Sequence, residues 1–172
     1  MRALLFNALA FQLGWIACVV GGDRLALPTV VIILGLHAVV SGCQRAEWLV
    51  IALSAALGIG LDSALHFFGI LRFDDFASWG VPLWLAALWL LFATTLNHSL
   101  RWLQWHPLWA ALIGAVFAPL SYWGGARLGA ASFGITMPAA LAVLAVCWGL
   151  LLPLLGAMMR HRIRVLSLCS GF

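Results

Sequence analysis

The sequence contains no lysine, and charged residues of any kind are scarce. Of its 172 residues, nine are basic (all arginine) and five are acidic, so charged residues make up 8% of the chain while 65% is hydrophobic. A soluble domain carries about 25% charged and about 45–50% apolar residues. The composition therefore argues against a soluble globular domain and indicates a polytopic membrane protein.

Motifs for metal, redox and nucleic-acid chemistry are also missing. The four cysteines form no CxxC pair and no Cys/His ligand spacing, and no HExxH or clustered histidine box is present. We therefore expect no metal and no cofactor. The arginines stand singly between apolar runs rather than in a basic stripe with interleaved aromatics, so we expect no nucleic-acid partner.

Six apolar segments are long enough to cross a bilayer as helices. A hydrocarbon core of roughly 30 Å needs about 20 helical residues. We expect an all-α, polytopic transmembrane helical bundle that forms one domain over residues 1–172. Its six spans are expected at about 3–20, 25–42, 48–71, 81–100, 107–123 and 137–159.

Three prolines suggest an internal repeat. Pro28, Pro82 and Pro138 each fall near the start of an expected helix, 54 and 56 residues apart. This spacing is compatible with three helical hairpins of similar plan. Because proline favours the first turn of any helix, a chance arrangement remains an alternative.

Arginine distribution predicts the orientation, since short cytoplasmic loops carry an excess of basic residues. With six spans, both termini lie on one side of the membrane. Six arginines fall on that side and three on the other, which predicts that both termini are cytoplasmic. The six are Arg2, Arg45, Arg101, Arg160, Arg162 and Arg164, and the three are Arg24, Arg72 and Arg127.

An acidic residue lies inside the expected span 48–71. On insertion scales an acid at the centre of a helix costs about 2.5–3.5 kcal/mol, so Asp62 should face the protein interior or a wet cavity. His66 follows four residues later on the same face, where a hydrogen bond to Asp62 is possible.

Counting the helical rise places a residue of another expected helix at the same height in the membrane as Asp62. Asp62 and Tyr122 both lie roughly 20–23 Å from the cytoplasmic ends of their helices. Residues near this height form a candidate substrate-binding layer: Asp62, His66, Ser63, Ser121 and Tyr122. The alternative is a network of interhelical hydrogen bonds with a purely structural role.

A second candidate polar layer lies nearer the cytoplasmic side. By the same count it contains His37, Thr94, Asn97 and His98. Structural alternatives exist for each member: His37 as a packing histidine, Thr94 bonded to its own helix backbone, and Asn97 with His98 as a solvated helix end.

Several stretches resemble a known family. They are Gly14-Trp15, Asp62-Ser63, the run from Pro82 to Ser99, and Pro119-Leu120-Ser121-Tyr122. With them the chain resembles a bacterial family of small integral inner-membrane proteins defined as a domain of unknown function, family 2878. The resemblance implies a bacterial inner-membrane location and a compact multi-helix fold, but no catalytic residues. Its members are often encoded near enzymes that modify membrane lipids, such as cyclopropane-fatty-acid-synthase-like methyltransferases.

Three functions are compatible with these features. The first is a carrier or lipid-handling protein with a polar intramembrane site around Asp62 and His66 and a membrane lipid as partner. The second is a scaffold or accessory subunit for a membrane-lipid-modifying enzyme. The third is an intramembrane enzyme that uses Asp62, His66 and Tyr122 as acid/base groups. The sequence indicates neither the substrate nor the oligomeric state.

Overall fold

The computed structural model describes residues 2–41, 45–73 and 80–169, and this part of the chain is mostly helical, with one short β-ladder. Four helices are long and apolar enough to cross a membrane. The expected all-α class is confirmed, with five α-helices in place of six. The elements are α1 (Arg2–Ser41), α2 (Arg45–Phe67), β1 (Leu71–Arg72), α3 (Leu83–Leu96), a 3-10 helix (Arg101–Trp105), α4 (Pro107–Arg127), β2 (Ser132–Phe133) and α5 (Met137–Cys169).

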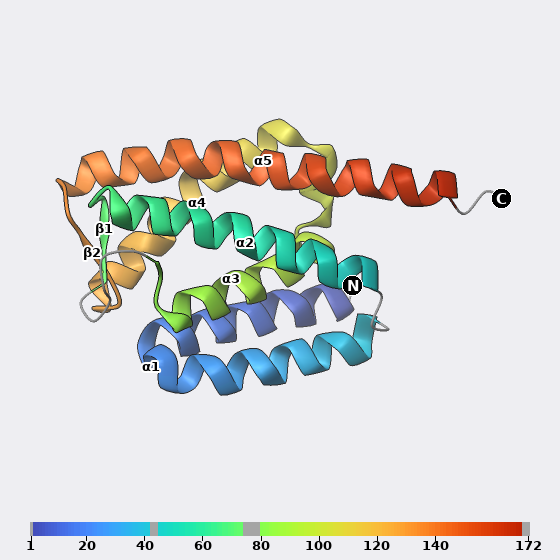
Figure 1. Cartoon of the computed structure of the whole chain (residues 1–172), viewed down its shortest axis with the longest axis horizontal. Coiled ribbons are helices and arrows are strands. Elements are labelled where there is room, and N and C mark those ends of the chain that lie inside the picture. Colours follow the sequence, from blue (N-terminus) through green and yellow to red (C-terminus); the bar gives the residue numbers. More distant parts are fainter. Residues whose placement is uncertain (1, 42–44, 74–79, 170–172) are drawn as a thin grey trace.

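The expected spans 3–20 and 25–42 correspond to the two arms of α1, which are two helices joined across a kink, although Gly42 lies outside the described residues. Gly22 interrupts this helix with φ 55° and ψ −152°. Glycine adopts this left-handed backbone readily because it has no Cβ. Figure 1 shows the chain reversing its direction here. The reversal is tied to α3, because Asp23 Oδ1 accepts a 2.8 Å hydrogen bond from the backbone N–H of Trp84.

Helix α3 lies inside the bundle and is shorter than the expected span 81–100. Its 14 residues span about 21 Å, and eight of them are buried. Near its end, the hydroxyls of Thr94 and Thr95 donate to the carbonyls of the residues three positions earlier, at 2.7 and 2.6 Å. Such bonds compete with helical backbone pairing. The helix ends at Leu96, and a turn and the 3-10 helix follow.

Helices α2 and α4 end in the same way. Each is followed by a glycine with positive φ, Gly69 (69°) after α2 and Gly129 (81°) after α4. The next amide donates back to the carbonyl five residues earlier, which is the Schellman pattern. The chain then forms β1 and β2, which pair antiparallel with Leu71 opposite Phe133. As a result, α2 ends four residues before the expected boundary and α4 extends four residues beyond it.

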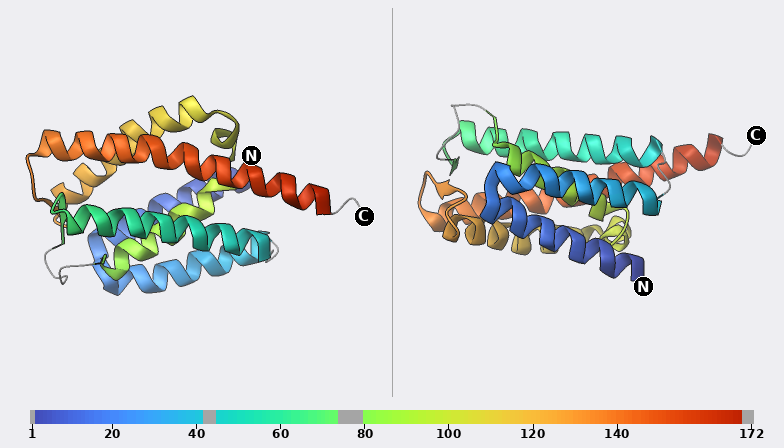
Figure 2. Two further views of the ribbon diagram at one scale, coloured as in Figure 1. Left: turned by 45° about the horizontal axis from the view of Figure 1, so that its top comes forward. Right: turned by 90° about the horizontal axis from the view of Figure 1, so that it is seen from below.

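The helices pack in two groups. One group contains α1, α2 and α3, with α3 against both of the others; the second contains α4 and α5 (Figure 2). Helix α4 approaches α5 closely at Gly114, where a Cβ would meet the backbone carbonyl of Trp148. The start of α1 and the end of α5 lie towards the same end of the bundle (Figure 1).

Candidate functional site

Asp62 lies at the junction of three helices and is completely buried. Its Oδ2 accepts a 2.7 Å hydrogen bond from the indole Nε1 of Trp89 on α3. Its Oδ1 accepts a 2.5 Å hydrogen bond from the hydroxyl of Tyr122 on α4. Each carboxylate oxygen therefore has a donor, as a buried polar group requires. Both partners are neutral side chains.

An aromatic wall surrounds this carboxylate. Gly58 lies one helical turn before Asp62, and a Cβ at this position would strike the Trp89 ring. The missing side chain lets Trp89 lie against α2 with its indole N–H towards the acid. Trp89 also stacks on Trp148 of α5, with ring centroids 4.9 Å apart and planes at 10°. Phe92 contacts both tryptophans edge-on.

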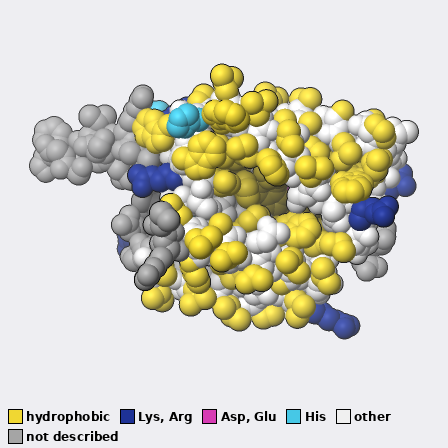
Figure 3. Space-filling model, turned by 180° about the vertical axis from the view of Figure 1, so that it is seen from behind, with side chains coloured by type: hydrophobic (Ala, Val, Ile, Leu, Met, Phe, Trp, Pro, Cys, Tyr) yellow, Lys and Arg dark blue, Asp and Glu magenta, His cyan; other side chains and the backbone are white. Residues whose placement is uncertain are grey.

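A cavity of about 420 Å³ lies against this wall. It is bounded by α1, α3, α4 and α5, and its lining is almost entirely apolar. Trp89, Phe92 and Trp148 of the aromatic wall line the cavity together with Tyr122, whereas Asp62 lies behind them. Seen from behind, the molecule is largely hydrophobic and is hollowed near the centre of this face (Figure 3).

One hydrogen bond connects α1 and α4 beside the cavity. The indole Nε1 of Trp15 donates to Ser121 Oγ at 2.9 Å, and both residues line the cavity. Trp15 also comes within 3.8 Å of the position that a Cβ on Gly124 would occupy. This bond therefore closes part of the space between the two groups of helices.

One buried donor on the cavity lining makes no well-aligned hydrogen bond among the described residues, although it interacts with the nearby Tyr122 hydroxyl. It is the indole Nε1 of Trp148, a residue that is only 8% exposed. A buried indole N–H normally finds an acceptor, because an unpaired one costs about 1–3 kcal/mol. A ligand that brings an acceptor oxygen to this part of the cavity would remove that cost.

The structure brings together part of the predicted outer layer. Asp62 and Tyr122 are hydrogen-bonded, and Ser121 precedes Tyr122 on the cavity lining. Ser63 is half-buried on α2 beside Asp62.

The possible hydrogen bond between Asp62 and His66 is not formed. His66 Nδ1 lies 3.2 Å from the carbonyl oxygen of Leu71 instead, and its ring packs against Phe73. The reason is local: α2 ends at Phe67, and the turn at Gly69 brings the Leu71 carbonyl back to the last helical turn. His66 therefore belongs to the helix end rather than to the Asp62 site.

The predicted second layer separates into three groups of contacts around the end of α3. The Thr94 hydroxyl lies 3.4 Å from the amide nitrogen of Asn7. Asn97 Oδ1 accepts a hydrogen bond from Gln104. The remaining two members, His37 and His98, approach a common partner that the sequence analysis did not include.

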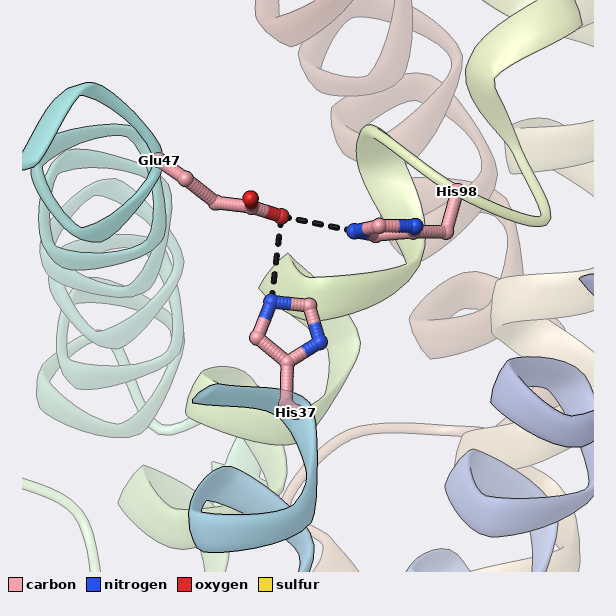
Figure 4. Close-up of side chains that lie close together, drawn as sticks. All are labelled: His37, Glu47 and His98. Carbon is pink, nitrogen blue, oxygen red and sulfur yellow. Dashed lines mark hydrogen bonds and ion pairs between the residues drawn. The ribbon is translucent and has the colours of Figure 1, made fainter. Parts of the chain in front are cut away.

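That partner is Glu47, in the first turn of α2 (Figure 4). His37 Nε2 lies 3.0 Å and His98 Nε2 lies 2.6 Å from the same oxygen, Glu47 Oε1. Histidine and carboxylate side chains are common metal ligands. Among the described residues, this is the group of such side chains that could hold a metal ion.

Comparison with known proteins identifies the family. The family model for DUF2878, described as a protein of unknown function, matches residues 4–154. The chain belongs to this family. The resemblance seen in the sequence is thereby confirmed, but membership in DUF2878 assigns no role to any residue. No curated protein and no solved structure matches the chain.

The sequence analysis missed three residues of the two sites described above, the Asp62 site and the His37–Glu47–His98 group. Trp89 and Trp148 occur in uniformly apolar helices, where nothing in the sequence shows which side faces a cavity. Glu47 directly precedes the expected span 48–71 and belongs to neither predicted layer. It could have been found, because His37, Glu47 and His98 all fall at the same end of the expected helices.

Proposed function

We propose that this DUF2878 protein is a lipid-binding membrane protein, a carrier or lipid-handling protein, with its ligand in the cavity between α1, α3, α4 and α5. The observation that carries the proposal is a partly open, apolar cavity of about 420 Å³ with a few polar groups on one wall. Sites for small ligands typically combine such an apolar lining with a small number of orienting polar groups.

The lining supports a specific orientation of the lipid. Its acyl chain would lie among apolar side chains such as Phe11, Ile113 and Phe117. An acceptor oxygen, as in a hydroxyl, carbonyl or carboxyl group, would meet the indole N–H of Trp148 beside the Tyr122 hydroxyl. Among the described residues the lining carries no Lys, Arg, Asp or Glu, so it offers no side chain that would form an ion pair with a charged soluble solute.

The proposed setting is the bacterial inner membrane. Four helices meet the length and hydropathy needed to cross it. We further propose six crossings, with the two arms of α1 counted separately and α3 crossing inside the bundle. Both termini would then be cytoplasmic, which agrees with the excess of arginines on that side and with the start of α1 and the end of α5 lying towards the same end of the bundle. The side chains of Arg2, Arg162 and Arg164 lie outside the described residues.

A second candidate function is acid/base chemistry on a bound lipid. It is favoured by the position of Tyr122, which lines the cavity and hydrogen-bonds to Asp62 behind it. A phenol in this position can carry a proton between a ligand in the cavity and the buried carboxylate. His66 takes no part, because it faces the end of α2.

A cavity-filling variant tests lipid binding. A Cβ on Gly125 would meet no atom within 4 Å, and Gly125 lines the cavity, so the side chain of Gly125→Leu should occupy part of it. Gly60→Leu is the matched control, because Gly60 is exposed on α2 with equally free space around it. Native mass spectrometry of the detergent-purified proteins measures the bound lipid.

We expect one tightly held lipid on the wild-type protein and on Gly60→Leu, and none on Gly125→Leu. Equal lipid retention by all three proteins would contradict the proposal. Absence of lipid from the wild type, together with a co-purifying lipid-modifying enzyme, would instead support the scaffold function.

A further inference from the structure

Two histidines and one glutamate from three separate segments converge at one end of the bundle (Figure 4). His37 lies near the end of α1, Glu47 in the first turn of α2, and His98 in the turn after α3. Their nearest ligand atoms all lie within 4.8 Å of one another. Because no two of these residues share a segment, only the tertiary fold brings them together.

We propose that His37, Glu47 and His98 bind one divalent first-row transition-metal ion. Two imidazole nitrogens and one carboxylate oxygen suit zinc, iron(II) and related ions, whereas magnesium and calcium favour sites made of oxygen atoms. The proposal does not depend on lipid binding, since none of the three residues lines the apolar cavity.

The ligand atoms lie close to the spacing that this ligand set needs. Metal–nitrogen and metal–oxygen bonds of about 2.0–2.2 Å place neighbouring ligand atoms of a tetrahedral site about 3.3–3.6 Å apart. The Nε2–Oε1 distances are 3.0 Å for His37 and 2.6 Å for His98. The two imidazole planes stand at 88° with centroids 4.9 Å apart, so the rings reach the carboxylate from different directions. A movement of about 0.8 Å by His98 and of about 0.4 Å by His37 would bring both nitrogens to this separation from Glu47 Oε1 and give an ion room between the three atoms.

The three side chains differ in their exposure to solvent. His37 is 7% exposed, Glu47 13% and His98 27%. Trp48 packs edge-on against the His37 ring and fixes its position. His37 and Glu47 are therefore largely shielded from solvent, whereas an ion can reach the site past the more exposed His98 side chain. Three protein ligands leave a fourth position open for water or an exogenous ligand.

Metal titration of the full-length protein tests the site. The protein is purified in detergent without a polyhistidine tag, stripped with a chelator, and titrated with Co²⁺ and then Zn²⁺. We expect one equivalent of Co²⁺ with visible d–d absorption bands, displaced by Zn²⁺. Loss of a second-shell partner costs about 10–100-fold in metal affinity, so removal of a ligand in Glu47→Gln or His98→Gln should cost at least about 100-fold.

His106→Gln is the matched control, because His106 is exposed and bonds to the backbone of Trp102. Its affinity for Co²⁺ should equal that of the wild type. The proposal is overturned if the wild type binds no stoichiometric metal, or if Glu47→Gln binds it as tightly as His106→Gln.

X-ray absorption of the Zn²⁺-loaded wild type gives a test that needs no variant. The proposed site predicts two imidazoles and oxygen in the first coordination shell, without sulfur. A shell with fewer than two imidazoles, or with a thiolate, would overturn it.

Discussion

The indole Nε1 of Trp89 donates a hydrogen bond of 2.7 Å to Asp62 Oδ2, across the contact between α3 and α2. Trp89 can only donate through this nitrogen, so the bond fixes one carboxylate oxygen as its acceptor. The Tyr122 hydroxyl, in contrast, can donate or accept. One carboxylate oxygen of Asp62 therefore has a structural role, as the acceptor for Trp89. The other is connected to the cavity through Tyr122.

This difference between the two carboxylate oxygens predicts different outcomes for two substitutions of Asp62. In Asp62→Asn, the amide oxygen can accept from Trp89 while the amide nitrogen donates to Tyr122, so the protein should lose less than about 1 kcal/mol. In Asp62→Leu, the buried indole N–H of Trp89 has no acceptor, and the loss should be about 1–3 kcal/mol. Thermal unfolding in detergent, followed by tryptophan fluorescence, measures both. A stability of Asp62→Leu equal to that of Asp62→Asn would contradict this account.

Two neighbouring glycines on α2 should respond in opposite ways to alanine. In Gly58→Ala the new methyl group strikes the Trp89 ring, and such overpacking typically costs about 1–3 kcal/mol. In Gly60→Ala the methyl group meets no atom, so the higher helix propensity of alanine should stabilise α2 by up to about 1 kcal/mol. The same thermal unfolding assay compares them. Similar shifts in both variants would show that Trp89 does not pack against Gly58.

Removal of the bond between Trp15 and Ser121 should speed the exchange of lipid. An interhelical hydrogen bond in a membrane protein contributes about 0.6 kcal/mol, which corresponds to about threefold in rate if the bond breaks before release. We therefore expect Ser121→Ala to release a dansyl-labelled fatty acid about threefold faster in stopped-flow fluorescence. Ser63→Ala, altered on α2 away from the cavity lining, should match the wild type. An unchanged rate in Ser121→Ala would exclude this bond as a barrier to release.

Reporter fusions test the orientation. A fluorescent protein fused after Phe172 should fluoresce, because it folds in the cytoplasm. Alkaline phosphatase fused after Ala131, between α4 and β2, should be active, because that connection would lie outside. Alkaline phosphatase fused after Phe172 should be inactive. Activity of the phosphatase at this position would place the C-terminus outside and contradict the proposed orientation.

Much of the fold follows from the sequence, because long apolar runs in a bilayer must become helices to pair their backbone groups. The differences arise where a helix ends or the chain turns. Helix α3 ends at Leu96, just after two threonines whose hydroxyls bond back to their own helix. Gly22 kinks α1 between the two expected spans, which become its two arms. Positive φ at Gly69 ends α2 early, which no hydropathy average registers.

The sequence predicted only those contacts of the candidate site that can be inferred from the height of each residue along its helix. Counting residues placed Asp62 and Tyr122 at one level, and the structure joins them. The same count could not show that His66 turns towards Leu71, because this depends on where α2 ends. It also could not select Trp89 among the apolar residues of α3, because selecting it requires the packing of α3 against α2.

Photo-crosslinking tests lipid binding in the cavity most directly. The probe is palmitic acid with a diazirine in its acyl chain, added to the protein in liposomes, illuminated, and mapped by peptide mass spectrometry. Leu85 and Trp148 line the cavity but are at most 8% exposed, so lipid surrounding the protein does not reach them. The account predicts labels on these two residues in the wild type and in Gly60→Leu, and their loss in Gly125→Leu. Labels confined to exposed residues such as Leu57 and Leu112, unchanged in Gly125→Leu, would contradict it.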